Sequence, residues 1–145
     1  MKPLENISNV YFVGIGGIGM SALARYVMLL GKNVFGYDKT ATHLTDELLK
    51  EGMKITFKDA VSEIPKGLTI ENSLIVYTPA IPKDSAILNY FTTEGFEVVK
   101  RAKLLGEVTK NTLCLAVAGT HGKTTTSAIL GHLMAECNMP VTAFL

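Results

Sequence analysis

The stretch from Val10 to Tyr26, VYFVGIGGIGMSALARY, decides the fold that the sequence predicts. Its first part, Val10 to Ile15, is a short apolar run typical of a strand covered on both faces. Its middle part places four glycines within six residues. Its last part has apolar residues at helical spacing, and Gly31 follows as a helix end. The apolar residues of this predicted helix are Met20, Leu23, Ala24, Val27 and Met28.

The glycines fit the pattern G-x-G-x-x-G between a strand and a helix, which is typical of a dinucleotide-binding loop. Gly14 is expected to allow the tight turn, Gly16 the approach of a diphosphate, and Gly19 close packing of helix on strand. Free N–H groups at the helix start, with the helix dipole behind them, attract an anion. Asp38 follows the next predicted strand, where a carboxylate can accept a hydrogen bond from a ribose hydroxyl. A ligand-free turn, with Asp38 as a cap, is the alternative. The motif does not name the nucleotide.

A second glycine-bearing loop, GTHGKTT, runs from Gly119 to Thr125. It is shorter than the usual phosphate loop G-x-x-x-x-G-K-[ST], but its chemistry is similar. Its N–H groups can bind an anion, Lys123 can neutralise terminal phosphates, and Thr124 can offer a hydroxyl to Mg²⁺. A solvated turn is the alternative. His121 fits either a phosphate contact or a tolerated loop position, and the sequence leaves both open.

Strand-like and helix-like segments alternate along the whole chain, which predicts strand-helix-strand units and a parallel sheet. The fold class is therefore α/β, a Rossmann-like parallel sheet with helices on both faces. A pause in the pattern near Lys110 predicts two domains, 1–111 and 112–145. The further strands are expected at 33–37, 55–57, 73–77, 96–99 and 113–118, and the further helices at 43–51, 85–93, 102–110 and after Lys123.

The composition fits a protein with a buried core, since 48% of the residues are hydrophobic and 19% are charged. A net charge of +1 gives no reason to expect a nucleic-acid or membrane surface. No apolar run is long enough to cross a bilayer, and no secretory signal is predicted, so we expect a cytoplasmic protein. Cys114 and Cys137 are expected to be buried, reduced thiols in a strand and a helix.

The histidines and the basic residues offer few further site candidates. His43 and His132 are expected to be ordinary helix positions, and no group of side chains has the spacing of a metal site. Three basic residues precede the predicted helix at 102–110. They form a solvated face, or alternatively Arg101 contacts a phosphate. The three residues are Lys100, Arg101 and Lys103.

The segments GIGGIGMSALA and AGTHGKTTT together resemble the Mur ligase family of bacterial peptidoglycan synthesis. Further support comes from GYDKT, YTPAIP and KRAKLLGEV, so the resemblance covers essentially the whole chain. It implies an enzyme with a UDP-binding domain, a central ATPase domain and a third domain for the amino acid. Residues 112–145 would then be the first strand, loop and helix of a P-loop ATPase domain. The anion of the first loop would be the diphosphate of a UDP-sugar.

The resemblance also implies the reaction and its site residues. ATP would phosphorylate the carboxylate of UDP-N-acetylmuramate, and L-alanine would attack the acyl phosphate; this chain alone, without the amino-acid site, is expected to be inactive. The UDP-sugar would be bound by Gly14, Gly16, Gly17, Ile18, Gly19, Met20, Asp38, Thr78, Ala80, Ile81 and Arg101. ATP would be bound by Gly119, Thr120, His121, Gly122, Lys123, Thr124 and Thr125, with Lys123 and Thr124 catalytic and Thr124 on Mg²⁺.

Three alternatives remain open at this point. A regulatory domain that binds a nicotinamide nucleotide would explain the first loop but leave the second without a role. A sibling ligase that recycles murein tripeptide shares the short phosphate loop, although its first motif differs from Gly16 to Ser21. A carrier of a UDP-sugar without ligase activity would require residues 112–145 to pack as a stable appendage.

Overall fold

The computed structural model describes residues 3–110 and 112–144. The chain divides into two compact units, Met1–Glu107 and Val108–Leu145.

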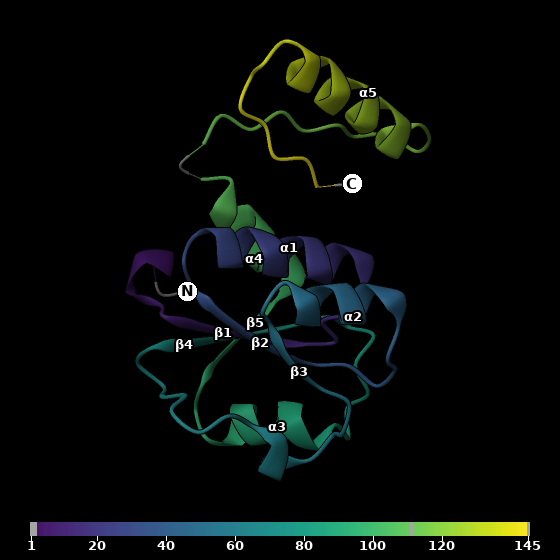
Figure 1. The fold of residues 1–145 in the computed structure, drawn as a ribbon. Coiled ribbons are helices and arrows are strands. Elements are labelled where there is room, and N and C mark those ends of the chain that lie inside the picture. The colour runs from purple at the N-terminus through teal and green to yellow at the C-terminus, as the bar shows by residue number, and fades with distance from the viewer. Residues whose placement is uncertain (1–2, 111, 145) are drawn as a thin grey trace. The chain divides into compact units, whose positions relative to one another are not determined.

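The first unit is built on a parallel five-stranded sheet with the strand order β3-β2-β1-β4-β5 (Figure 1). Its strands are β1 (Asn9–Val13), β2 (Asn33–Tyr37), β3 (Lys54–Thr56), β4 (Ser73–Tyr77) and β5 (Glu97–Lys100). Every neighbouring pair runs parallel, and in the centre Val13 of β1 lies in register with Tyr37 of β2 and Tyr77 of β4. The predicted α/β class and parallel sheet are confirmed, with strand ends that shift by only a residue or two.

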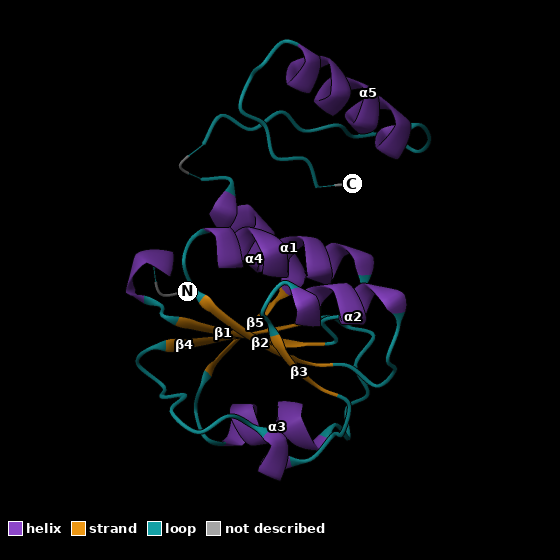
Figure 2. Cartoon of the chain, in the orientation of Figure 1, coloured by secondary structure: helices purple, strands orange, loops and turns teal. Residues whose placement is uncertain are grey.

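Helices cover both faces of this sheet, as the alternating sequence pattern predicts (Figure 2). Helices α1 (Ile18–Leu29), α2 (His43–Lys50) and α4 (Arg101–Val108) lie on one face, and α3 (Ala86–Thr93) lies on the other. Short 3₁₀ turns occupy Leu4–Asn6 and Val61–Glu63. All five residues of β1 are buried, which explains the continuous apolar run that starts at its second residue, Val10.

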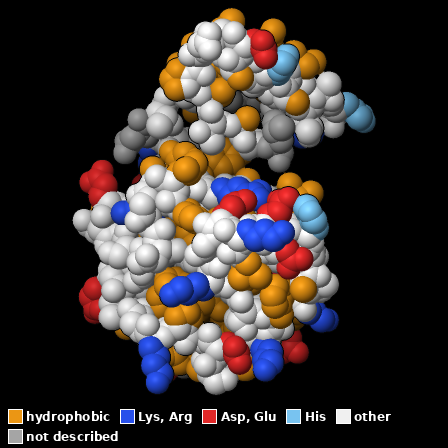
Figure 3. Space-filling view, in the orientation of Figure 1, with side chains coloured by type: hydrophobic (Ala, Val, Ile, Leu, Met, Phe, Trp, Pro, Cys, Tyr) orange, Lys and Arg blue, Asp and Glu red, His pale blue; other side chains and the backbone are white. Residues whose placement is uncertain are grey.

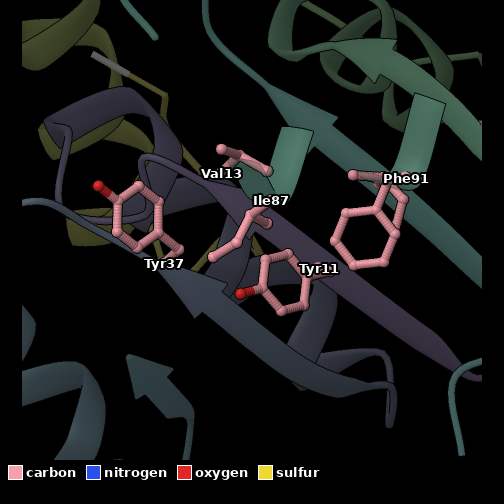
Figure 4. Packing of buried hydrophobic residues seen from close by; sticks show 6 residues of the cluster. Tyr11, Val13, Tyr37, Ile87 and Phe91 are labelled. Atoms are coloured by element: carbon pink, nitrogen blue, oxygen red, sulfur yellow. The ribbon is translucent and has the colours of Figure 1, made fainter. Parts of the chain in front are cut away.

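The core on the α3 side is aromatic (Figure 4). The ring centroids of Tyr11 and Phe91 lie 4.9 Å apart, in tilted contact. The hydroxyl of Tyr11 is buried and has no hydrogen-bond partner among the described residues. Burial raises the pKa of Tyr11, and the nearby charges of Asp59 and Glu63 raise it further. The buried members of this cluster are Tyr11, Val13, Tyr37, Ile75, Ile87 and Phe91.

Two helices of the first unit begin at side-chain caps. The Thr42 hydroxyl accepts from the Thr45 N–H at the start of α2, and the Thr45 hydroxyl accepts from the Thr42 N–H. At the start of α3, the Ser85 hydroxyl accepts from the Leu88 N–H. Asp59 adds a carboxylate there that accepts from the Ile87 N–H at 2.9 Å. These caps fix where the two helices meet the carboxyl edge of the sheet.

The second unit contains helix α5 (Lys123–Glu136), which begins after the second glycine loop as expected. The predicted strand from Leu113 to Ala118 is wrong: these residues form no regular secondary structure, and most are exposed. The physical reason is that a parallel strand needs a neighbour to bond to, and no other strand lies in the described part of this unit. The prediction of buried thiols is also wrong, because Cys114 and Cys137 are both exposed.

The surface of the first unit mixes both signs of charge on the face that Figure 3 displays, in keeping with the net charge of +1. Within residues 3–110 and 112–144, the helices are all too short or too polar to cross a membrane.

Candidate functional site

The first glycine loop lies at the carboxyl end of β1, where the strand order reverses. The chain proceeds from β1 to β2 and β3 on one side of the sheet, and β4 then pairs with the other edge of β1. In open α/β sheets, ligands bind at this switch point outside the carboxyl ends of the strands. The loops after β1 and β4 therefore line the place where a ligand is expected.

Gly14 and the loop after β4 are in close contact. Gly14 has φ +88°, so it makes the tight turn in a conformation that other residues rarely adopt. A Cβ on Gly14 would lie 2.9 Å from Ile81 Cδ1 and 3.3 Å from Thr78 Cγ2. The Ile81 N–H bonds the Thr78 carbonyl, and Ala80 is an exposed residue of this turn. The structure thus brings together Gly14, Thr78 and Ile81, three of the residues predicted for the UDP-sugar.

Helix α1 begins without a side-chain cap. Its N-cap is Gly17, and its first turn contains no acidic residue. The N–H groups of Ile18 and Gly19 occupy the first two helical positions, which have no intrahelical acceptor. The Ile18 side chain is 78% exposed, so this end of the helix is open to solvent. Met20 is buried and anchors the first turn, with its N–H on the Gly17 carbonyl.

Arg101 lies directly against this helix start. A Cβ on Gly19 would meet Arg101 Nη1 at 2.7 Å, and the three nearest heavy atoms all belong to Arg101. The expectation that Gly19 serves helix-strand packing is therefore wrong, because its missing side chain leaves room for a guanidinium. No carboxylate among the described residues pairs with Arg101. A cation beside the positive end of a helix is a favourable place for an anion.

The other two basic residues of this segment are exposed. Lys100 and Lys103 thus belong to the solvated face, whereas Arg101 alone faces the glycine loop. Sequence periodicity could not show which of the three basic residues contacts the glycine loop, because that depends on which of them lies next to Gly19 in the folded structure.

Asp38 also turns toward the glycine loop. Its Oδ2 accepts a hydrogen bond from the Gly16 N–H at 2.7 Å, and its Oδ1 accepts from the Thr40 N–H at 3.2 Å. The Gly14 and Ile15 N–H groups both donate to the Tyr37 carbonyl, at 2.7 and 3.1 Å. The end of β2 therefore binds three successive N–H groups of the loop.

Thr45 is a site neighbour that the sequence reasoning missed. A Cβ on Gly16 would meet Asp38 Oδ2 at 2.8 Å and Thr45 Cγ2 at 2.9 Å. The absence of a side chain at Gly16 is thus explained by contacts within the protein. The available signal was a capping box of two threonines, which lacks the usual Glu or Gln at its third helical position.

The second glycine loop lies in the second unit. Gly119 has φ +153° and Gly122, the N-cap of α5, has φ +76°. Lys123 Nζ donates to the Gly119 carbonyl at 2.7 Å and to the Thr120 carbonyl at 3.4 Å. The His121 Nδ1 lies 3.2 Å from the Thr120 hydroxyl.

The remaining loop residues leave the helix start accessible. Thr124 and Thr125 occupy the second and third positions of α5 and are exposed. His43 and His132, in contrast, are exposed helix residues, and His43 lies 3.4 Å from Glu47.

The fold is that of a Rossmann-like α/β domain with a parallel sheet, and comparison with known proteins identifies the family. A family model described as "Mur ligase family, catalytic domain" matches residues 9–112. The chain belongs to the Mur ligase family.

Named relatives are similar over nearly the whole chain. The UDP-N-acetylmuramate–L-alanine ligase of Flavobacterium psychrophilum is 58% identical over 98% of this chain and 32% of its own length. That of Porphyromonas gingivalis is 53% identical over 96% of this chain and 31% of its own length. The chain thus spans about a third of the length of the curated relatives that it matches.

Solved structures share the fold. The UDP-N-acetylmuramate-alanine ligase of Thermotoga maritima superposes with a TM-score of 0.80 at 30% identity, covering 90% of this chain and 30% of that one. A murein peptide ligase of Psychrobacter arcticus has the same TM-score of 0.80 at 23% identity, covering 93% and 30%. The second likeness concerns the fold alone.

Proposed function

We propose that this chain is the UDP-sugar-binding part, with the phosphate loop, of a ligase that joins L-alanine to UDP-N-acetylmuramate. The observation that carries the proposal is the Arg101 guanidinium at the open N-terminus of α1, beside Gly19, where no carboxylate among the described residues pairs with it. A diphosphate group fits a helix start and a guanidinium because both present N–H donors and positive charge. The names of the relatives supply the sugar and the amino acid.

In this proposal, the first unit holds the substrate by its nucleotide end. The Ile18 and Gly19 N–H groups and Arg101 bind the diphosphate, and the turn from Thr78 to Ile81 lies beside the uridine. Because Gly14 of the glycine loop has no side chain, that turn can pack closely against the loop. Binding of this remote part of the substrate positions the muramyl carboxylate for reaction, which is how phosphoryl-transfer enzymes gain much of their rate.

The second loop fits a triphosphate by its chemistry. Two glycines with positive φ, Gly119 and Gly122, shape a short loop whose backbone N–H groups can bind an anion. Helix α5 begins directly after this loop. The Lys123 ammonium donates hydrogen bonds to carbonyl groups of the loop itself, and the phosphate oxygens of a bound ligand would replace these acceptors. The exposed Thr124 hydroxyl would serve as a ligand for Mg²⁺, which when bound neutralises phosphate charge.

The proposed reaction forms one amide bond at the cost of one ATP. The muramyl carboxylate takes the γ-phosphoryl group and releases ADP, and the L-alanine amine then displaces inorganic phosphate from the acyl phosphate. We place this reaction in the cytoplasm, where ATP is available.

Calorimetric titration of the 145-residue chain with UDP-N-acetylmuramate, with NAD and NADP in parallel, tests the proposal. Saturable binding of the UDP-sugar alone is the expected result. Binding of a nicotinamide nucleotide without a response to the UDP-sugar would overturn the proposal and favour a nicotinamide-sensing domain.

A further inference from the structure

Asp38 holds the glycine loop through backbone hydrogen bonds. Its carboxylate spans two backbone donors, the Gly16 N–H at 2.7 Å and the Thr40 N–H at 3.2 Å. The bond to Gly16 is short and charge-assisted, which is the stronger class of hydrogen bond. Together with the Tyr37 carbonyl, which accepts from Gly14 and Ile15, it ties the loop to the end of β2.

This arrangement changes which anion the loop can accept. In dinucleotide-binding domains, the second glycine lets the pyrophosphate approach the backbone, and the acid after the second strand bonds a ribose hydroxyl. In this chain the Gly16 N–H already donates its hydrogen bond to the Asp38 carboxylate. A phosphate group placed at that N–H would meet a carboxylate, and like charges at such close range are strongly unfavourable.

The donors further along the loop stay available. The N–H groups of Ile18 and Gly19 follow at the start of α1, and Arg101 lies against Gly19. The loop therefore has a negative side at Gly16 and a positive side at Gly19. A diphosphate is directed to the positive side.

We propose that Asp38 is a positioning and specificity residue, whose carboxylate fixes the loop through Gly16 and keeps dinucleotide diphosphates from binding there. The identity of the accepted ligand rests on the proposed function above. The role of Asp38 toward the loop does not, since it depends only on contacts within the first unit.

The first measurement is the amide NMR shift of Gly16 in the ligand-free chain. An N–H bonded to a carboxylate resonates downfield, so the Gly16 amide is expected downfield of Gly17 and Gly19. Asp38→Asn, which keeps the shape but removes the charge, is expected to move it upfield. Glu5→Gln is the matched control, because it removes an exposed carboxylate at the other end of β1.

The second measurement is the ratio of the dissociation constants for NAD and UDP-N-acetylmuramate. Asp38→Asn is expected to shift this ratio toward NAD by about tenfold or more, because a repulsive charge leaves the second glycine. Glu5→Gln is expected to leave the ratio unchanged. A merely structural role of Asp38 would weaken both ligands alike and would not move the ratio.

The outcomes separate the two proposals. A Gly16 amide that is not downfield in the unmodified chain overturns the role of Asp38, and that measurement needs no variant to fold. A ratio that is unchanged, or shifted away from NAD as a ribose contact would require, overturns it as well. If the unmodified chain fails to bind the UDP-sugar while the Gly16 amide behaves as expected, the proposed function fails and the loop contact stands.

Discussion

From the position of Arg101 beside Gly19 we predict how much the affinity for UDP-N-acetylmuramate depends on this guanidinium. Arg101 is partly exposed, so we place its charge-assisted bond to a phosphate in the lower part of the usual range, about 1.5–2 kcal/mol. Arg101→Ala should therefore weaken UDP-N-acetylmuramate binding by about 10- to 30-fold. Lys103→Ala removes an exposed cation two residues away and should change the affinity by less than about twofold at moderate salt.

Gly19→Ala should act through the same guanidinium. The new methyl group would lie 2.7 Å from Arg101 Nη1, so the guanidinium must move away to reach ordinary contact at 3.4 Å or more. A displacement approaching 1 Å should cost about three- to tenfold in affinity. The helix itself should gain about 0.5–1 kcal/mol, because alanine replaces a helical glycine.

A double-mutant cycle, measured by calorimetric titration and thermal unfolding, checks this reasoning. Once Arg101 is alanine, Gly19→Ala has no guanidinium to displace, so the double variant should bind no more weakly than Arg101→Ala alone. Additive losses would refute the shared mechanism. A loss from Gly19→Ala that appears together with a lower melting temperature would refute it too.

Four further predictions concern stability. Tyr11→Phe should leave the free energy of unfolding unchanged or raise it by up to about 2 kcal/mol in urea denaturation, because the buried hydroxyl lacks a partner among the described residues. Burial raises the pKa values of Tyr11 and Tyr37 above the ordinary value of 10.0. The stability that their neutral hydroxyl groups contribute is therefore fully present below about pH 10 and is lost as the pH rises further, because the tyrosines of the unfolded chain ionise first; Tyr11→Phe should reduce that loss. Gly36→Ala should cost about 1–3 kcal/mol in the same assay, since its methyl group would lie 2.7 Å from a core side chain, whereas Gly106→Ala, in open space, should cost nothing. Asp59→Ala should lower the melting temperature through a loss of about 1–2 kcal/mol, as it removes the carboxylate at the start of α3, and an unchanged melting temperature would contradict that role.

The sequence pattern predicted the first unit well because local signals and burial agree there. The run at β1 is apolar throughout since both faces of a central parallel strand are covered. Gly31 follows the end of α1 with φ +77°, a conformation that glycine adopts at little cost. The end of the helix could therefore be predicted from the sequence as well. Strands 33–37 and 73–77 have the predicted bounds.

The same reasoning failed where a segment depends on neighbours elsewhere. Leu113 to Ala118 has the composition of a buried strand, yet the described part of its unit gives it no strand to pair with. The exposed Leu133 and Ile129, each 56% exposed on α5, show the same mismatch between apolar sequence and burial. Composition reports what a segment is suited to, whereas burial requires a partner surface.

The sequence predicted which residues surround the first glycine loop. It could not predict the contacts that each of these residues makes. The G-x-G-x-x-G spacing located the loop correctly at a strand end and helix start. It could not show that Asp38 turns back to the Gly16 N–H or that Arg101, far along the chain, reaches Gly19. Both contacts arise from the order of the strands, which a linear motif does not contain.

The central place of β1 in the sheet has a consequence for how the protein is made. β1 pairs on one edge with β2 nearby in sequence, but on its other edge with Ser73–Tyr77, and its Tyr11 ring rests on Phe91. Most of the first unit must therefore leave the ribosome before its first strand can be enclosed. Such non-local pairing slows folding, so this segment spends a long time as an exposed apolar strand. We therefore expect a chaperone to act on the emerging chain before the glycine loop after β1 has formed.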